Sequence, residues 1–284
     1  MGAQVFFGSY RPNTLRRALS YAGDDGFVAS LPQLLHARTD APYDNILWNG
    51  PFNAYSEENV VTTPQGNHVV VVIHGSGIYA TPARFEKMYY ASTDTRSEHG
   101  YTGQFAAKIS TAEARDVLEG RMPDGAEIPV YPFDEFRQGI DDLPIRYGVI
   151  LDYALARQSE CGYIEFAVLK DDPNLIARAG GVAAAAAYLD KFKARHNTSR
   201  MGHWHPYNDI DPDQPQTNTL FLAGNKGGAR SDVDDFDPES RTQREDGYHS
   251  ETGIGGGGMG GLARYVAGAP RDESTDVSDL DFGV

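Results

Sequence analysis

The residues best suited to chemistry gather in one polar segment, residues 203–213. Two imidazoles, His203 and His205, are followed there by three aspartates at every second position. Side chains two residues apart in an extended chain project from one face about 7 Å apart, so both imidazoles can reach one ion. Nitrogen and oxygen donors together suit Zn, Mn or Fe. The segment therefore predicts a divalent-metal site made by His203, His205, Asp209 and Asp211, with a solvated loop held by Asx turns as the alternative.

A second candidate site is the Gly-rich turn that follows His74. It comes directly after the apolar run 69–73 and precedes Thr81-Pro82, where an N-cap followed by proline predicts the start of a helix. Backbone amides of such a turn can hold a phosphate or carboxylate. The turn lacks the third glycine of the dinucleotide fingerprint and the Gly-Lys-Ser/Thr of a P-loop, so a plain tight turn is the alternative. The predicted anion site consists of Gly75, Ser76 and Gly77, with Arg38 or Arg146 as an anion clamp.

Acid/base catalysis at such a ligand would fall to His74 or His203. Ser76 and Cys161 are weaker candidates for a catalytic nucleophile. Ser76 does not lie in a Gly-x-Ser-x-Gly motif. Cys161 is the one cysteine of the chain and follows Glu160, whose carboxylate would raise the thiol pKa.

Hydrophobic periodicity places these residues on a mixed α and β core. The run 69–73 is apolar on both faces and predicts an interior strand. Helices are expected at 12–22, from Thr81, at 110–119 with a Ser110/Glu113 capping box, and at 172–196 with a break at Gly180-Gly181. Further strands are expected at 126–131, 145–151, 163–169 and 219–223, and residues 24–59 are expected to be irregular apart from short strands at 27–30 and 45–48. The predicted class is α+β, or a layered α/β fold, in which helices pack on a mixed sheet.

Composition divides the chain into three parts: a core at 1–200, a polar His/Asp-rich loop region at 201–228, and an acidic Gly/Asp-rich tail at 229–284. The tail holds 13 acidic and five basic residues, a net charge of −8. It has too few apolar residues to fold alone, so we expect contacts outside it to order it. Its expected anchors in a neighbouring surface are Phe236, Tyr248, Leu262, Tyr265 and Phe282.

Charge and hydropathy exclude several partners. With 40 acidic and 25 basic residues the net charge is −15. Nucleic acid is bound by Lys and Arg that displace counterions, so we expect no nucleic-acid partner. No apolar stretch reaches about 18 residues, which predicts no membrane insertion. The basic residues near the start follow the apolar patch, the reverse of a secretory signal, which favours a cytoplasmic protein, or a virion protein if its role is structural.

Three segments, Leu143–Arg146, Gly162–Ala167 and Gly202–His205, loosely resemble the order of segments in archaeal-type inosine monophosphate cyclohydrolases. The Asn-Gly turn followed by Thr-Asp that marks that family is missing after the valine run, so no functional residue is carried over.

Two main classes of function remain open, and a third, a metal-dependent binding module, rests on the cluster 203–213 alone. One is an enzyme that acts on a small anionic metabolite or nucleotide by hydrolysis or cyclohydrolysis. The other is a homo-oligomeric structural subunit of a self-assembling particle, such as a viral capsid or a shell, with its loops and tail ordered by neighbouring subunits.

Overall fold

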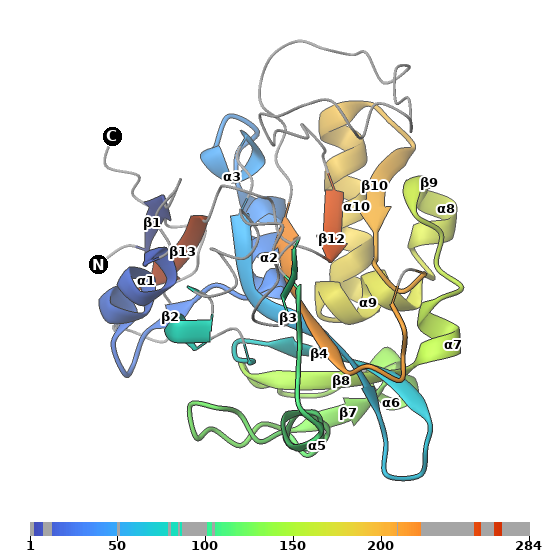
Figure 1. Cartoon of the computed structure of the whole chain (residues 1–284). Coiled ribbons are helices and arrows are strands. Elements are labelled where there is room, and N and C mark those ends of the chain that lie inside the picture. Colours follow the sequence, from blue (N-terminus) through green and yellow to red (C-terminus); the bar gives the residue numbers. More distant parts are fainter. Residues whose placement is uncertain are drawn as a thin grey trace.

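The structure is a computed structural model that describes residues 3–7, 13–49, 52–78, 81–84, 86, 101–103, 106–208, 210–222, 253–256 and 264–268. The fold is mixed α+β, built on a ten-stranded sheet and a separate three-stranded sheet (Figure 1). No helix in the described part of the chain is long and apolar enough to cross a membrane.

The large sheet has the strand order β7-β8-β4-β3-β11-β12-β10-β9. Its centre is an antiparallel group formed by β3 (Phe52–Thr62), β4 (His68–His74), β8 (Tyr147–Asp152) and β11 (Gln216–Leu222). One side ends with β7 (Val130–Pro132), and the other continues through β12 (Gly253–Gly256) and β10 (Arg200–Trp204) to β9 (Gly162–Glu165). Two short strands, β5 (Tyr101–Gly103) and β6 (Ala106–Lys108), pair with each other, and β6 also pairs with β11.

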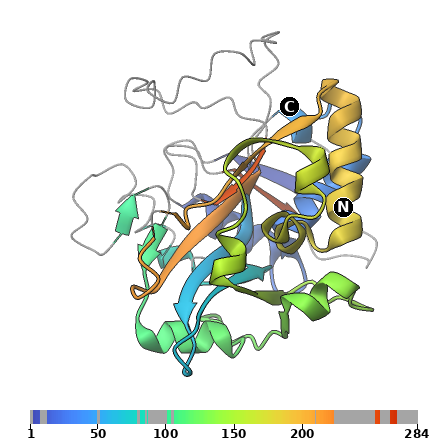
Figure 2. The same cartoon turned by 90° about the vertical axis from the view of Figure 1, so that its right-hand side faces the viewer.

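Helices cover one face of this sheet (Figure 2). The layer is made by α2 (Leu31–Asp40), α3 (Ile46–Asn49), α6 (Phe133–Gln138), α7 (Tyr153–Ala156), α8 (Phe166–Leu169), α9 (Pro173–Ala179) and α10 (Val182–His196). Alternate residues of the strands, such as Val70, Val72, Leu220 and Leu222, form one buried core with these helices. We call this the helix face and the opposite one the outer face.

Part of the outer face carries two smaller hydrophobic clusters. Near β4 it packs against α5 (Thr111–Leu118), whose Ala114 and Val117 belong to one buried cluster with Val71 and Ile73. Near Tyr55 it packs against α1 (Thr14–Ala22) and the small sheet, which has the order β1-β13-β2. The strands of that sheet are β1 (Ala3–Phe7), β13 (Arg264–Gly268) and β2 (Phe27–Val28).

Several local predictions are confirmed. The 69–73 run is an interior strand between β3 and β8. Ser110 caps α5 and forms the expected capping box with Glu113. The break at Gly180-Gly181 separates α9 from α10, because both glycines have positive φ (91° and 122°).

Other local predictions are wrong. Residues 24–59 are not irregular, since they contain α2, α3 and most of β3. The strand expected at 163–169 ends at Glu165, and α8 follows it. The segments after residue 200 contribute β10 to β13 to the two sheets. Tyr265, expected as an anchor in a neighbour, is buried against Leu15, Ala18 and Tyr55 of its own chain. The other four anchors lie outside the described residues.

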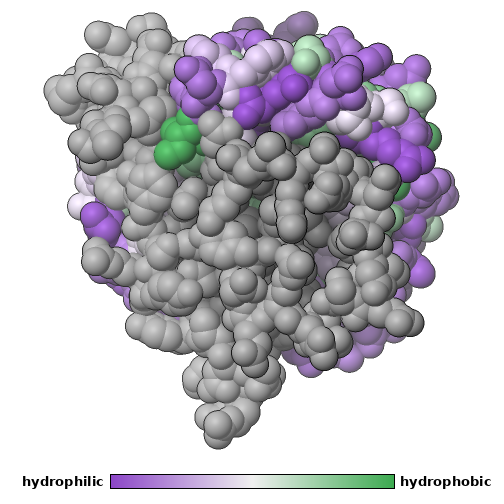
Figure 3. Space-filling view, turned by 90° about the horizontal axis from the view of Figure 1, so that it is seen from above, coloured by the Kyte–Doolittle hydropathy of each residue, from purple (hydrophilic) through white to green (hydrophobic). Residues whose placement is uncertain are grey.

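The described surface is mostly hydrophilic, as expected for a chain with 23% charged residues. Seen from above, the part of the surface whose placement is described is mostly hydrophilic (Figure 3).

Candidate functional site

His74, the first candidate acid/base, joins the sheet to the helix layer. Its Nε2 lies 2.9 Å from the carbonyl oxygen of Ala177 in α9, and its Nδ1 lies 2.9 Å from Ser56 Oγ. A carbonyl can only accept, so Nε2 carries the proton and Nδ1 accepts from the Ser56 hydroxyl. Ser56 Oγ in turn accepts from the backbone N–H of Leu31, at the start of α2, at 2.9 Å. One buried chain of hydrogen bonds therefore connects α2, β3, β4 and α9.

A buried ion pair connects the same helix to β3 next to this chain. Arg178 of α9 donates through Nε and Nη2 to the two carboxylate oxygens of Glu58, at 2.6 and 2.9 Å, and both side chains are fully buried. Burial alone would raise the pKa of Glu58, but Arg178 outweighs that effect and holds it below its usual range. Both groups stay charged, and the bidentate geometry fixes α9 against the sheet.

His203, the second candidate acid/base, belongs to this network. Arg178 Nη1 lies 3.1 Å from His203 Nε2 and 2.8 Å from the carbonyl oxygen of Trp204. A guanidinium can only donate, so Nε2 of His203 accepts and the imidazole is neutral. Asp172, the N-cap of α9, lies 3.8 Å from the same nitrogen. The Arg178–Glu58 ion pair and the imidazole of His203 together attach β10 to α9.

The pKa values of all three imidazoles fall below the ordinary value, and burial is the main cause for each. Burial lowers the pKa of His74 to about 4. Burial, followed by the charge of Arg178, lowers the pKa of His203 well below its usual value. Burial lowers the pKa of His205 as well. These histidines are neutral near pH 7, and their fixed tautomers position elements of the fold.

Where a metal site is predicted, the structure has a set of internal hydrogen bonds. His205 Nε2 lies 2.8 Å from the carbonyl oxygen of Ser159, and its Nδ1 accepts from the N–H of Tyr207 at 3.3 Å. The ring centroids of His203 and His205 are 6.5 Å apart, but the lone pair of each imidazole already accepts from a protein donor. Metal ligation needs that lone pair. Asp211 accepts from the N–H of Asp213 at 3.1 Å.

No cluster of three or more histidine, cysteine or acidic side chains able to hold a metal occurs among the described residues. Asp209 lies outside them. The proposed metal ligands are thus adjacent in the chain but are not arranged as a metal centre in the described part.

In the predicted anion-binding turn, the protein's own carboxylate occupies the place expected for a ligand. Glu57 Oε1 accepts from the backbone N–H of Ile78 at 2.9 Å and from Asn59 Nδ2 at 3.0 Å. Gly77 has φ 137°, and a Cβ built there would lie 2.4 Å from the Glu57 carboxylate oxygen. The amide of Gly75 is also used, donating to the carbonyl oxygen of Tyr55 at 2.8 Å. Ser76 is buried beside them.

The two candidate anion clamps do not meet. Arg38 is buried in the helix layer, where it donates to the Tyr188 hydroxyl at 3.1 Å and lies over the Trp48 ring. Arg146 is exposed on the loop before β8 and pairs with Asp124 at 3.0 Å. Arg146 does lie next to Gly75, where a Cβ would be 3.1 Å from its Cγ.

A different arrangement of side chains lies on the outer face, at its β9 side. Trp204 of β10 and Tyr163 of β9 meet edge to face, with ring centroids 5.6 Å apart. Both are half-buried, and so is Phe221 of β11. Their neighbours along the strands, Met201, Ile164 and Leu220 with Leu222, belong to the core on the helix face, so alternation directs the three rings outward.

Between these rings the sheet carries glycine. Strand register pairs Trp204 with Gly255 and Gly255 with Phe221, so one row across three strands reads aromatic, glycine, aromatic. In the next row Tyr163 pairs with Gly202, and Gly202 pairs with Gly253. Glycine has no side chain, so these positions contribute only backbone to this side of the sheet, between the aromatic residues. We call this part of the face the glycine–aromatic strip (Tyr163, Gly202, Trp204, Phe221, Gly253 and Gly255).

Polar side chains continue the outer face from the strip toward β3, and the buried carboxylate of Glu57, opposite Thr219, is one of them. Thr219 of β11 and Asn53 and Asn59 of β3 point to this side and are at least 97% buried. The hydroxyl oxygen of Thr219 and the amide oxygen of Asn59 have no hydrogen-bond partner within the described ranges, while Asn53 is hydrogen-bonded to Tyr265.

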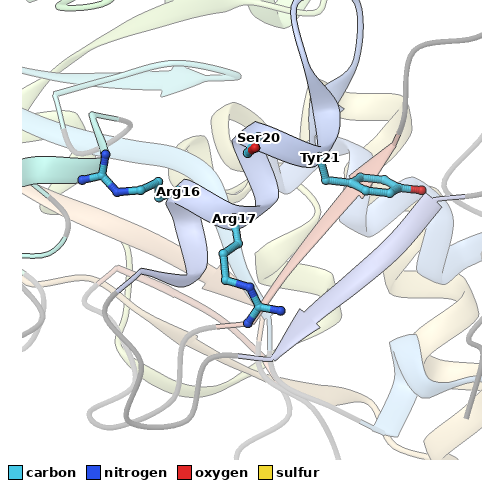
Figure 4. Close-up of a pocket in the computed structure, with 4 residues that line it drawn as sticks. All are labelled: Arg16, Arg17, Ser20 and Tyr21. Atoms are coloured by element: carbon cyan, nitrogen blue, oxygen red, sulfur yellow. The ribbon is translucent and has the colours of Figure 1, made fainter.

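A shallow hollow on α1 is lined by Arg16, Arg17, Ser20 and Tyr21. Figure 4 shows that the two arginine side chains point apart and that Tyr21 points away from both. Arg16 is already paired with Glu86 at 2.8 Å. The side chains that line this hollow do not converge, so they do not form a site for one ligand.

Sequence reasoning found His203 but gave no weight to Trp204 beside it. Strand register, which the sequence alone does not reveal, is what sets Gly255 between two aromatic residues 17 positions apart in the chain.

Comparisons with known proteins show the fold alone. No protein-family model matches the chain, and no curated protein matches it in sequence. A solved structure described as "Accommodation of massive sequence variation in Nanoarchaeota by the C-type lectin fold" is similar to it with a TM-score of 0.61. The two sequences are 21% identical, and the match covers 93% of this chain and 96% of that chain.

Proposed function

We propose that this chain is a binding protein on a C-type lectin-like scaffold, and that it recognises a macromolecular ligand through the outer face of β11, β12, β10 and β9. The observation that carries the proposal is how polar and aromatic groups are divided between the two faces. On the helix face, Glu58, Arg178, His74 and His203 are all buried and bonded to one another or to the backbone. On the outer face of β11, β12, β10 and β9 lie partly exposed aromatic rings, glycines and one exposed ion pair, Glu165–Arg200.

The helix face is suited to holding the fold together, and the outer face is suited to recognition. Acid/base chemistry needs a group that reaches substrate at hydrogen-bond distance, and the buried network is used to hold α9 to the sheet. Recognition surfaces of proteins are enriched in aromatic residues and depleted of charge at their centre. Tyrosine, tryptophan, glycine and asparagine are also the residues that binding loops use to combine contact area with adaptable hydrogen bonds. The outer face has this composition.

The likeness to a C-type lectin fold that accommodates massive sequence variation supports the same proposal. A scaffold can tolerate sequence change at its surface when its own polar core holds the framework. Here the ion pair Arg178–Glu58 and the chain through His74 and Ser56 supply that framework.

The test is a binding screen with a matched control. The wild-type protein is screened against a phage-displayed peptide library and a glycan array, and each enriched ligand is measured again with Trp204→Ala and Tyr43→Ala. Tyr43 is an exposed aromatic residue far along the chain from the strip, on the loop before α3. We expect ligands that Trp204→Ala loses and Tyr43→Ala keeps. Ligands unaffected by Trp204→Ala, or the absence of any specific ligand, would refute the proposal.

The hydrolase and particle-subunit hypotheses stay predictions. Metabolite profiling with purified protein would reveal turnover, and native mass measurement would reveal particles of tens of subunits. Either result would replace the binding proposal.

A further inference from the structure

Strand β10 is where the buried network meets the outer face. His203 on this strand is fully buried on the helix face, and the ring of the next residue, Trp204, lies on the outer face. One nitrogen of the guanidinium group, Arg178 Nη1, donates to both residues: to His203 Nε2 at 3.1 Å and to the carbonyl oxygen of Trp204 at 2.8 Å. A change at the imidazole therefore acts on the backbone that carries Trp204.

His203 can take up a proton only at the nitrogen that faces Arg178. Because Nε2 accepts from the guanidinium, it holds the lone pair, and Nδ1 holds the proton. A second proton, on Nε2, removes this acceptor and places two cationic N–H donors 3.1 Å apart. The carboxylate of Asp172 is 3.8 Å from the same nitrogen, beyond hydrogen-bond distance, so it does not replace the lost contact without movement. The protonated imidazole does not fit the closed arrangement.

His205, which follows β10, is held in the same surroundings as His203. The groups that face these two imidazoles from the rest of the fold are Arg178 and Asp172 of α9, Glu58 of β3, the ring of Tyr207, and the carbonyl oxygens of Ser159 and Glu160. Burial and the charge of Arg178 lower the pKa of both imidazoles, and Glu58 opposes them without restoring the ordinary value. Each lone pair accepts from a protein donor, so neither imidazole is a metal ligand in this arrangement.

Acid favours an opened form of the segment that carries these imidazoles. Once released into water, they titrate near the ordinary pKa of about 6.5. The closed form holds both pKa values lower, so the opened form binds more protons, and the closed form loses stability as the pH falls below about 6.5. Each released imidazole raises the opened population about tenfold per pH unit in this range.

We infer that His203 is an acid-sensitive latch of the outer face: the neutral imidazole and Arg178 hold β10 in place, and protonation releases β10 together with the ligand bound there. The inference rests on the proposed function, whose regulation it describes. In the order of the large sheet only β9 lies beyond β10. Local openings cost less free energy than global unfolding, so β10 can separate while the central strands stay paired.

The test follows the indole N–H signals of the protein in a two-dimensional nitrogen–proton NMR spectrum as the pH is lowered from neutral. The chain has two tryptophans, Trp204 on β10 and Trp48, which is 1% exposed in the core. Trp204→Phe assigns the two signals. We expect the Trp204 signal to change at a higher pH than the Trp48 signal, which reports the rest of the fold. One shared midpoint would show that acid unfolds the whole chain, and would overturn the latch.

Two substitutions separate the latch from a general effect of buried histidines. His203→Gln keeps an acceptor toward Arg178 that takes up no proton, so proton uptake in the Trp204 transition should fall from about two protons to about one. His74→Gln is the matched control, because His74 is an equally buried imidazole on the interior strand β4, and it should leave that uptake unchanged. Equal uptake in the wild type and His203→Gln would contradict the latch.

The affinity of a peptide ligand that depends on Trp204 should fall over the same pH range in which the Trp204 signal changes. An affinity that stays constant through this range would overturn the inference. Failure here is distinguishable from failure of the proposed function. If the Trp204 signal changes first but no macromolecular ligand depends on Trp204, the binding proposal fails and the acid release of β10 stands. If ligand binding depends on Trp204 but both signals share one midpoint, only the latch fails.

Discussion

The buried Arg178–Glu58 pair makes a strong prediction about stability. Replacing Arg178 by methionine leaves the carboxylate of Glu58 buried without its partner, and it removes donors from His203 and from the Trp204 carbonyl. Removing one member of a buried ion pair costs about 3–5 kcal/mol. A domain has about 5–15 kcal/mol of stability, so Arg178→Met should lose a large part of the free energy of unfolding.

The double variant separates the charge from the packing. Glu58→Leu combined with Arg178→Met removes both charges, so it should recover about 2 kcal/mol relative to the sum of the single losses. Recovery stays incomplete, because the Trp204 carbonyl and His203 still lack their donor, at about 1–3 kcal/mol for each buried unpaired group. Urea unfolding measures all four proteins, with an unchanged denaturant slope as the check that the same surface unfolds. A loss below about 1 kcal/mol for Arg178→Met, or strictly additive single changes, would contradict the pairing.

Three further predictions follow from the same framework. The pKa of His74 is lowered to about 4, against about 6.5 in an unfolded chain, so the unfolded state binds more protons between these values. The stabilising contribution of His74 should therefore fall by about 3 kcal/mol as the pH drops from 6.5 to 4, and His74→Asn should make the pH dependence less steep by that amount in pH-dependent urea titrations. Gly77→Ala and Gly66→Ala both strain a positive-φ glycine, at about 1–3 kcal/mol, but only Gly77 faces a buried carboxylate, so it should lower the melting temperature further; equal shifts would contradict the packing. A chain that stops at Gly268 should melt like the full chain, whereas one that stops at Gly228 lacks β12 and β13 and should lose cooperative unfolding by calorimetry; similar melting of the two would show that these strands do not support the fold.

Local signals in the sequence predicted a good part of the framework. The Ser110/Glu113 capping box, the Gly180-Gly181 break and the valine run act over a few residues, and each gave the observed element. The long strand β3 was missed for a physical reason. Its centre, residues 56–59, is four polar residues in succession, a pattern typical of a solvated segment, yet all four are buried. Their partners lie far along the chain: Glu58 pairs with Arg178, 120 residues away.

The candidate site, too, depends on contacts between residues far apart in the chain, which local sequence does not reveal. The residue types singled out His74 and His203. Both are central to the structure, where their uncharged imidazoles form hydrogen bonds that connect the sheet to the helices. The turn at Gly77 was expected to hold an anion, and the carboxylate beside it belongs to Glu57 on the neighbouring strand. Neither partner can be read from local sequence, because strand register brings them together.

The central claim is that the outer face, and not the buried histidine network, carries the function. Its most direct test is the dissociation constant of one enriched peptide ligand for the wild-type protein, Trp204→Ala and Tyr43→Ala, measured by calorimetry. An interface hot spot costs at least about 2 kcal/mol, so Trp204→Ala should weaken binding about 30-fold or more, while Tyr43→Ala stays within about twofold of the wild type. Unchanged affinity for Trp204→Ala, or equal weakening by both substitutions, would contradict the account.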